Sequence, residues 1–183
     1  MEDPLYDLPA DLPVRLTRAG FVAEEQETVL IGVAKELREE PPLADGVTIR
    51  RVTAPEDLRA IAAMESAVWG EDWSWLADDL IRRVGEGPDA IVVLVAEAEG
   101  RVVSAAWLVR KPGTTFAGLW GGSTLPEWRG RGIYRALVAH RARLAVAAGV
   151  DYLQVDASED SRPILQRLGF QAITTTTPYI WTP

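Results

Sequence analysis

The stretch Thr124-Leu125-Pro126-Glu127-Trp128-Arg129-Gly130-Arg131-Gly132-Ile133-Tyr134 joins a predicted strand to a predicted helix. Its glycines let the backbone approach a bulky anion without a side-chain clash. The helix start adds free backbone N–H groups and partial positive charge, and the arginines add attraction. A tight turn with solvated arginines is the alternative, but the glycines follow a glycine-interrupted strand and open an amphipathic helix. The stretch therefore predicts a pyrophosphate site.

Two better-known phosphate motifs fit this loop poorly. A dinucleotide fingerprint needs Gly-x-Gly-x-x-Gly and an acidic residue near the end of the next strand. A Walker-type loop needs Gly-Lys followed by Ser or Thr, which occurs nowhere in the chain. The loop therefore indicates another kind of phosphate-containing ligand.

Hydrophobic periodicity around the loop predicts an α/β (α+β) domain. The expected strands are 47–52, 91–96, 101–109, 115–124, 152–155 and 170–181, and the expected helices are 55–69, 73–84, 132–148 and 158–168. Thr53 and Ser158 are expected to cap two of these helices. The expected inward face of helix 132–148 consists of Ile133, Ala136, Leu137, His140, Leu144 and Ala147. The order β-α-α-β-β-β-α-β-α-β implies a mixed, mostly antiparallel twisted sheet with helices on both faces. Glycines at 118, 121 and 122 predict a bulge or a close backbone approach in strand 115–124.

Composition excludes several classes of site. The 183 residues include no cysteine and one histidine, His140, so disulfides, thiolate catalysis and multi-histidine metal sites within one chain are excluded, and no metal is expected. The net charge of -8 argues against a nucleic-acid partner. Arginines 129, 131, 135, 141 and 143 nevertheless form a local basic stretch that suits a small anion. No apolar run approaches the roughly 20 residues that span a bilayer, and the acidic start does not resemble a signal peptide, so we expect a soluble cytoplasmic protein without a membrane partner.

The first 45 residues differ from the rest of the chain. The charged segment 36–45, with Pro41-Pro42, is typical of a linker, so we expect an N-terminal extension at 1–45 and the main domain at 46–183. Residues 16–23 (LTRAGFVA) align with 165–172 (LQRLGFQA). This similarity suggests that 5–34 is the remnant of an upstream repeat, packed on the main domain or on another subunit of a homodimer, although coincidence remains an alternative.

With these residues in place, the sequence resembles the GNAT superfamily of N-acetyltransferases. The family signature, Arg/Gln-x-x-Gly-x-Gly/Ala at a helix start, is matched by Arg129 and Gly132, with Tyr134 in place of the last small residue. A second family feature, Leu-Gly-Phe after a short helix, is matched at 168–170. The resemblance covers residues 46–183 and implies the GNAT fold with acetyl-CoA, or another acyl-CoA, as donor.

The resemblance also implies which residues hold the donor. The pyrophosphate would lie on the backbone of the loop, and the pantetheine arm would pair like an extra strand near Gly122. The implied cofactor-binding residues are Gly122, Ser123, Thr124, Arg129, Gly130, Arg131, Gly132, Ile133, Tyr134, Arg135 and Ser158. A backbone N–H near 123–125 would stabilise the oxyanion of the tetrahedral intermediate.

The residues that move protons cannot be transferred from the family. The position of the family's tyrosine acid is Leu165, the position of its asparagine is Ser158, and strand 116–124 carries no carboxylate. Weak catalytic candidates are Tyr134, Tyr179 and Glu65, with Glu71 and Asp72 as further carboxylates and water as an alternative base. Trp69, Trp73 and Trp75 are interpreted either as an aromatic wall for the acceptor or as core, and we favour core.

The sequence thus predicts an acyl-CoA-dependent N-acyltransferase that transfers an acetyl group to a primary amine of a small molecule or, less in keeping with the pattern, a peptide. The alternative is a non-catalytic acyl-CoA-binding sensor or interaction module. The acceptor itself cannot be read from the sequence.

Overall fold

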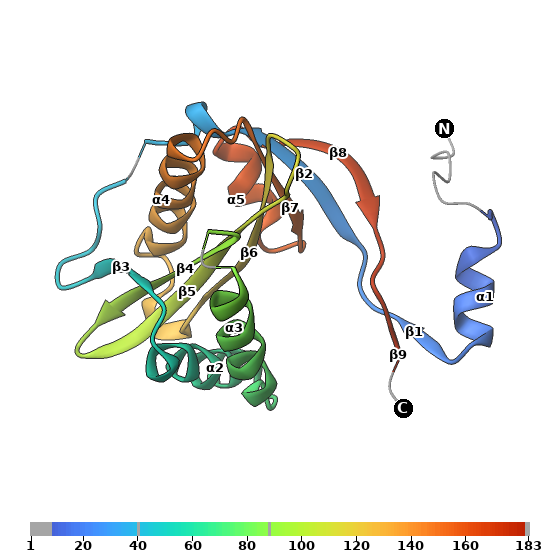
Figure 1. The fold of residues 1–183 in the computed structure, drawn as a ribbon, viewed down its shortest axis with the longest axis horizontal. Helices are drawn as coiled ribbons and strands as arrows, with labels where there is room; N and C mark the ends of the chain where they lie inside the picture. Colours follow the sequence, from blue (N-terminus) through green and yellow to red (C-terminus); the bar gives the residue numbers. More distant parts are fainter. Residues whose placement is uncertain (1–8, 40, 88, 182–183) are drawn as a thin grey trace.

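The computed structural model describes residues 9–39, 41–87 and 89–181, so the acidic start at 1–8 lies outside the described residues (Figure 1). The helices are α1 (Leu12–Arg18), α2 (Pro55–Trp69), α3 (Ser74–Glu86), α4 (Ile133–Ala147) and α5 (Arg162–Arg167), with 3-10 turns at Ala34–Glu36 and Pro126–Trp128. The strands are β1 (Phe21–Ala23), β2 (Glu27–Val33), β3 (Thr48–Val52), β4 (Ile91–Ala98), β5 (Arg101–Arg110), β6 (Phe116–Thr124), β7 (Tyr152–Ala157), β8 (Gln171–Thr176) and β9 (Tyr179–Trp181).

The main sheet within the described ranges has seven strands in the order β3-β4-β5-β6-β7-β2-β8. Its neighbouring strands are antiparallel except β6 and β7, which are parallel. Val93 through Ala96 on β4 are all buried, so helices cover both faces of this part of the sheet. The mixed, mostly antiparallel fold that the sequence predicts is confirmed, and β2 is inserted into it.

Strands β6 and β7 diverge after a short paired segment. They pair only from Phe116–Tyr152 to Gly118–Gln154. On its other side, β6 continues to pair with β5, but the register shifts so that Gly122 is left between the paired residues Gly121 and Ser123. Such a bulge increases the local twist and bends the strand. The predicted irregularity of this strand is confirmed, and it opens a gap in the sheet.

The N-terminal extension enters the main sheet. Strand β2 lies between β7 and β8 and pairs antiparallel with both. Leu30 on β2 is fully buried in the second hydrophobic core, which α4 and α5 also line. The extension therefore packs on the same chain, and a boundary at residue 45 would separate β2 from its own sheet.

A second, smaller sheet pairs the two ends of the chain. Strands β1 and β9 form this two-stranded ribbon, which projects away from the main sheet (Figure 1). It pairs Val22 with Ile180 and Ala23 with Tyr179. In the sequence alignment, Gly20 matches Gly169, a difference of 149 residues. Adding 149 to the β1 residue numbers and subtracting 149 from the β9 residue numbers converts these pairs into Gln171–Ile31 and Ala172–Leu30. These two pairs are the observed register of β8 with β2. The shared register supports the hypothesis of a repeat, which stays a hypothesis.

Helix α4 differs from its expected form at two residues, Arg141 and Ala147. Gly132 adopts a left-handed conformation at φ 79° and ψ -4° just before the helix, as its role at the helix start requires. Arg141, expected to belong to a basic surface stretch, is only 1% exposed. Ala147, expected to face inward, is exposed. The helix is buried on two sides because it packs beneath β5, β6 and the 3-10 turn at Ala34–Glu36.

One of the two predicted helix caps, Thr53, is wrong. Ala54 rather than Thr53 precedes α2, and no side chain caps this helix. Ser161 directly precedes α5, but the Ser158 hydroxyl accepts a hydrogen bond from the Ser161 N–H at 3.4 Å and the Ser158 carbonyl accepts one from the Arg162 N–H, so Ser158 caps the turn that leads into this helix. Proline in the first turn of each helix removes one unsatisfied N–H group, which reduces the need for a side-chain cap.

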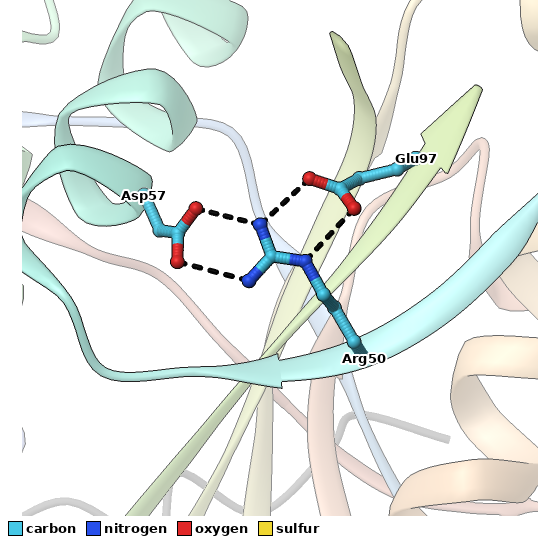
Figure 2. A network of polar contacts seen from close by, with 3 residues as sticks. All are labelled: Arg50, Asp57 and Glu97. Atoms are coloured by element: carbon cyan, nitrogen blue, oxygen red, sulfur yellow. Dashed lines mark hydrogen bonds and ion pairs between the residues drawn. The ribbon is translucent and has the colours of Figure 1, made fainter. Parts of the chain in front are cut away.

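An arginine joins three elements at one end of the sheet. Arg50 of β3 makes paired hydrogen bonds with the carboxylates of Asp57 on α2 and Glu97 on β4, at 2.6–2.9 Å (Figure 2). These bonds lower the pKa of both carboxyl groups. The group is partly exposed, so its energetic contribution is modest. It fixes the start of α2 against the sheet.

Within the described residues, no helix is both long enough and apolar enough to cross a membrane.

Candidate active site

A cleft of about 1320 Å³ opens where β6 and β7 diverge. Its walls also include the start of α4, the α5 region and residues of β2 and β8. Small-molecule pockets usually measure about 300–1,000 Å³. The cleft therefore has room for an extended ligand together with a second molecule.

One wall of the cleft is an open strand edge. From Leu119 to Thr124, the β7 side of β6 has no strand partner among the described residues. A Cβ atom at Gly122 would lie 2.7 Å from Cε2 of Tyr134, so glycine is needed for the tyrosine ring to pack here. An open edge with exposed backbone groups can pair with an extended ligand as it would with another strand.

The end of the cleft is formed by the loop before α4. The first hydrogen bond of the helix runs from the Ala136 N–H to the Gly132 carbonyl at 3.0 Å. The N–H groups of Ile133, Tyr134 and Arg135 therefore have no partner within the helix, as at any helix start. Arg129 holds the loop in place, since its Nε donates to the Thr124 carbonyl at 3.0 Å.

The structure brings nearly all predicted donor-binding residues to the cleft. The residues that line it are Gly122, Ser123, Thr124, Arg129, Gly130, Gly132, Ile133, Tyr134, Arg135 and Ser158. Arg131 is the exception, because its guanidinium stacks 4.4 Å above the Trp128 ring and it does not line the cleft. The basic stretch is also smaller than expected, since Arg141 is buried.

The candidate proton donors are separated by the fold. Tyr134 lines the cleft, and burial raises the pKa of its hydroxyl, opposed by the Arg141 charge. Tyr179 pairs with Ala23 in the β1–β9 ribbon and is not among the cleft residues. Leu165, at the position of the family's tyrosine, is fully buried. Tyr134 is thus the tyrosine that the fold brings to the site.

The carboxylate candidates differ in how far their side chains are buried. Glu71 and Asp72 are exposed, and Asp72 accepts a hydrogen bond from the Ser74 N–H at the start of α3. Glu65 on α2 is only 2% exposed. Its Oε2 accepts a hydrogen bond from Trp69 Nε1 at 2.9 Å, whereas its Oε1 is buried with no hydrogen-bond partner among the described residues. Burial raises the pKa of Glu65, and the Ser123 hydroxyl and the Trp69 indole oppose the shift.

The tryptophans do not form a core cluster. Trp69 is 58% exposed and lines the cleft, while Trp73 is half-buried and packs between Trp69 and Trp75. Trp75 is exposed and does not line the cleft. The favoured interpretation as core is therefore wrong for Trp69 and Trp75, because they lie where α2 ends and α3 begins, with their side chains exposed.

The cleft is also lined by residues that the sequence did not indicate as site residues, among them Trp120, Glu27 and Asp156. Trp120 on β6 is 54% exposed. Val29 pairs with Asp156, which places Glu27 diagonally across from Asp156 on one face of the sheet. Burial raises the pKa of Glu27, and the charges of Asp156 and Glu24 raise it further. Only the pairing of β2 with β7, which is a long-range contact, reveals this acidic wall.

Arg141 supports the bulge from below. Its Nη1 donates to the Trp120 carbonyl at 3.1 Å and to the Trp107 carbonyl at 3.4 Å, and its Nε donates to the Leu137 carbonyl. Burial lowers its pKa to about 10, so it remains charged at neutral pH. The arginine holds two backbone carbonyls inward at the point where β6 bends.

Comparison with known proteins agrees with this architecture. The model of the acetyltransferase (GNAT) family matches residues 56–170, which is more than half of the chain. The chain therefore belongs to the GNAT acetyltransferase family, whose members generally use acetyl-CoA. Strand β2, with Glu27, lies outside the matched region.

Individual relatives are more distant. A mycothiol acetyltransferase of Tsukamurella paurometabola is 25% identical over 146 residues, which cover 71% of this chain and 50% of that protein. The chain thus spans about half the length of this curated relative. A GCN5-related N-acetyltransferase of Kribbella flavida superposes with a TM-score of 0.65 at 18% identity, over 93% of this chain and 63% of the other. An acetyltransferase of Trypanosoma brucei superposes with a TM-score of 0.58 at 22% identity, over 69% and 94%. These two structures show similarity of fold.

Proposed function

We propose that this protein transfers an acetyl group from acetyl-CoA to a primary amine of a small molecule. The observation that carries the proposal is the cleft between the diverging strands β6 and β7, which joins the α4 loop to an acidic and aromatic wall. Acetyl-CoA is the second substrate of this reaction rather than a resident group.

The donor half of the cleft suits a pyrophosphate and its extended arm. The free N–H groups of Ile133, Tyr134 and Arg135 point from the helix start, where the helix dipole favours an anion. Arg129 and Arg135 line the same end and contribute positive charge. The open edge of β6 offers backbone groups to the amide-containing arm. The fit rests on the backbone, which explains why Tyr134 is compatible with it although the family usually has a smaller residue there.

The acceptor half suits a cation. Glu27 and Asp156 face the cleft from adjacent strands, and like charges so placed repel one another until a cation approaches. No ion pair to either carboxylate is found among the described residues, although Gln154 Nε2 donates to Asp156 at 3.2 Å. The exposed indoles of Trp69 and Trp120 add flat surfaces that attract ammonium groups. These features support an amine acceptor.

The chemistry requires an amine free of its extra proton, a stabilised oxyanion and a proton for the departing sulfur. The bulge at Gly122 provides backbone N–H groups for the oxyanion. Positioning of both substrates in one cleft supplies a large part of the rate enhancement. The Tyr134 ring packs beside the bulge and lines the cleft, which makes Tyr134 one of the cleft side chains that could donate a proton to the sulfur.

A direct assay tests this function. The chain has no cysteine, so the thiol released from acetyl-CoA can be followed with a thiol-reactive chromophore without background from the protein. Turnover is expected with primary amines, with a preference for those that carry a second positive charge. In parallel, acetyl-CoA is expected to raise the melting temperature, because a ligand that binds only the native state stabilises it. A larger shift with NAD than with CoA would contradict the assignment.

A non-catalytic acyl-CoA sensor is the second candidate. The observation that favours it is Leu165, whose fully buried side chain occupies the position of the family's tyrosine acid. Tight binding of acetyl-CoA without turnover across a broad amine panel would support the sensor and reject the transferase.

A further inference from the structure

Glu65 is a buried carboxylate with an unused oxygen. It lies in the last turn but one of α2 and is 2% exposed. Trp69 Nε1 donates to Oε2, and Oε1 has no hydrogen-bond partner among the described residues. A buried polar group without a partner destabilises the folded state, and more so when it is charged. A glutamine would pack in the same space with a smaller desolvation cost, so the carboxylate calls for a functional explanation.

The Glu65 carboxyl group lies close to Ser123, a residue of the cleft wall. Ser123 is half-buried, lines the cleft and follows the bulge residue Gly122. Its hydroxyl is close enough to the Glu65 carboxyl group to oppose the rise in its pKa, although no hydrogen bond to Oε1 forms in this structure. The Ser123 backbone is fixed, because its carbonyl accepts a 2.6 Å hydrogen bond from Ser104 Oγ. The hydroxyl can therefore rotate between Glu65 and the cleft while the backbone stays in place.

We propose that Ser123 and Glu65 form a proton relay in which the Ser123 hydroxyl touches the substrates and the Glu65 carboxylate behind it stores the proton. This inference rests on the proposed transferase function. Ser123 is then a catalytic residue, and Glu65 is a positioning and proton-storing residue that acts through it.

The relay closes the proton balance of the reaction without a further reactant. The amine nitrogen forms a bond to the thioester carbonyl carbon, and the added nitrogen carries one proton too many. Ser123 Oγ accepts this proton while donating its own to Glu65 Oε1. When the carbon–sulfur bond breaks, the same path returns the proton to the sulfur, which leaves as the CoA thiol. The carboxylate and the hydroxyl end in their starting states.

The surroundings of Glu65 suit this task. Among the described residues, the groups that perturb its carboxyl group besides burial are Ser123 of β6 and Trp69 of α2, and neither is charged. Burial raises the pKa of the carboxyl group, so its carboxylate form is a stronger base than that of an exposed glutamate.

The test compares Glu65→Gln and Ser123→Ala with the parent. Both variants should bind acetyl-CoA in calorimetry like the parent, because the donor contacts the backbone. Both should lose turnover by about a hundredfold or more. The acidic limb of the kcat/KM profile against pH should disappear in Glu65→Gln, an effect that a structural role alone would not produce. The double variant should be no slower than the slower single variant, because the two residues act as one unit.

Controls separate the relay from general damage. Ser123→Thr keeps a hydroxyl and should retain most of the turnover. Glu56→Gln removes an exposed carboxylate from the first turn of the same helix and should leave the profile unchanged. Parent-like turnover in Glu65→Gln or in Ser123→Ala would overturn the relay. Absence of turnover in the parent itself would instead reject the transferase function on which the relay rests.

Discussion

Replacement of Gly132 by valine tests the donor site most directly. Gly132 stands at φ 79°, immediately before α4, and lines the cleft. A Cβ atom at this position would lie 3.7 Å from the Pro42 carbonyl oxygen, an ordinary van der Waals contact, so there is space for a side chain. That space lies beside the free N–H groups of the first helical turn. Gly132→Val is therefore expected to obstruct the site of the pyrophosphate.

The magnitude follows from the contacts that the side chain would displace. A hydrogen bond to a charged group contributes roughly 1.5–3 kcal/mol, so losing one or two should weaken CoA binding by about a hundredfold or more, since about 1.4 kcal/mol corresponds to a tenfold change in Kd. The left-handed backbone adds a folding cost of roughly 1–2 kcal/mol for a residue with a side chain. The two effects need to be measured separately.

Gly149 provides a matched control. It follows the other end of α4 at φ 76°, where a Cβ atom would have no described neighbour within 4 Å, and it does not line the cleft. Gly149→Val should therefore lose a similar amount of stability but bind CoA like the parent. Arg131→Ala should also have little effect, because Arg131 stacks on Trp128 outside the cleft.

Circular dichroism first verifies that each variant is folded. Calorimetric titration with CoA then measures the Kd of each variant and of the parent. Parent-like affinity in folded Gly132→Val would refute the donor site. An equal loss of affinity in Gly149→Val would show that strain in α4, rather than obstruction of the cleft, causes the effect.

Three further predictions concern the buried polar groups. The pKa of Glu65 is raised in the folded state, so the stability that its neutral form provides is present below its unfolded pKa and is lost as the pH rises through the folded value. Glu65→Gln should therefore raise the melting temperature relative to the parent, and the difference should grow from about pH 4 toward neutrality. Thermal melts of both proteins at several pH values measure this difference. Trp69→Phe removes the indole donor and should shift the acidic limb of kcat/KM to higher pH, and an unchanged limb would contradict the assigned base. Arg141→Met leaves the Trp120 carbonyl without its donor and should cost about 2–4 kcal/mol in urea unfolding with weaker CoA binding, whereas a variant of parental stability would show that the bulge does not depend on Arg141.

The local part of the site was predictable from the sequence. Glycines at 130 and 132, the helix that follows them and the irregular strand before them are short-range features with a direct backbone meaning. Both glycines have positive φ, as a loop that approaches a ligand requires. The order of elements from β3 to β8 was likewise accessible, because each strand and helix has its own hydrophobic period.

Side-chain burial was harder to predict. Arg141 looks like one more arginine in a basic stretch, yet β5 and β6 cover it and give it carbonyl partners. Glu65 looks like an ordinary helix residue at a helical spacing from the core positions. Its significance comes from Ser123, which is distant in sequence and adjacent only after the sheet forms. Such pairs carry no local signal.

The placement of β2 links the fold to the acceptor. Its alternating burial, with Leu30 inward and Val29 partly exposed, fits a half-buried strand, but the pattern does not say which strands it joins. Insertion between β7 and β8 buries Leu30 in the second core and brings Glu27 to the cleft beside Asp156. The residues proposed to hold the donor thus lie in the region that the family model matches, whereas Glu27 of the proposed acceptor wall lies on a strand outside it. If the acidic wall selects the acceptor, specificity in this protein depends on a segment that a comparison of the matched region alone would miss.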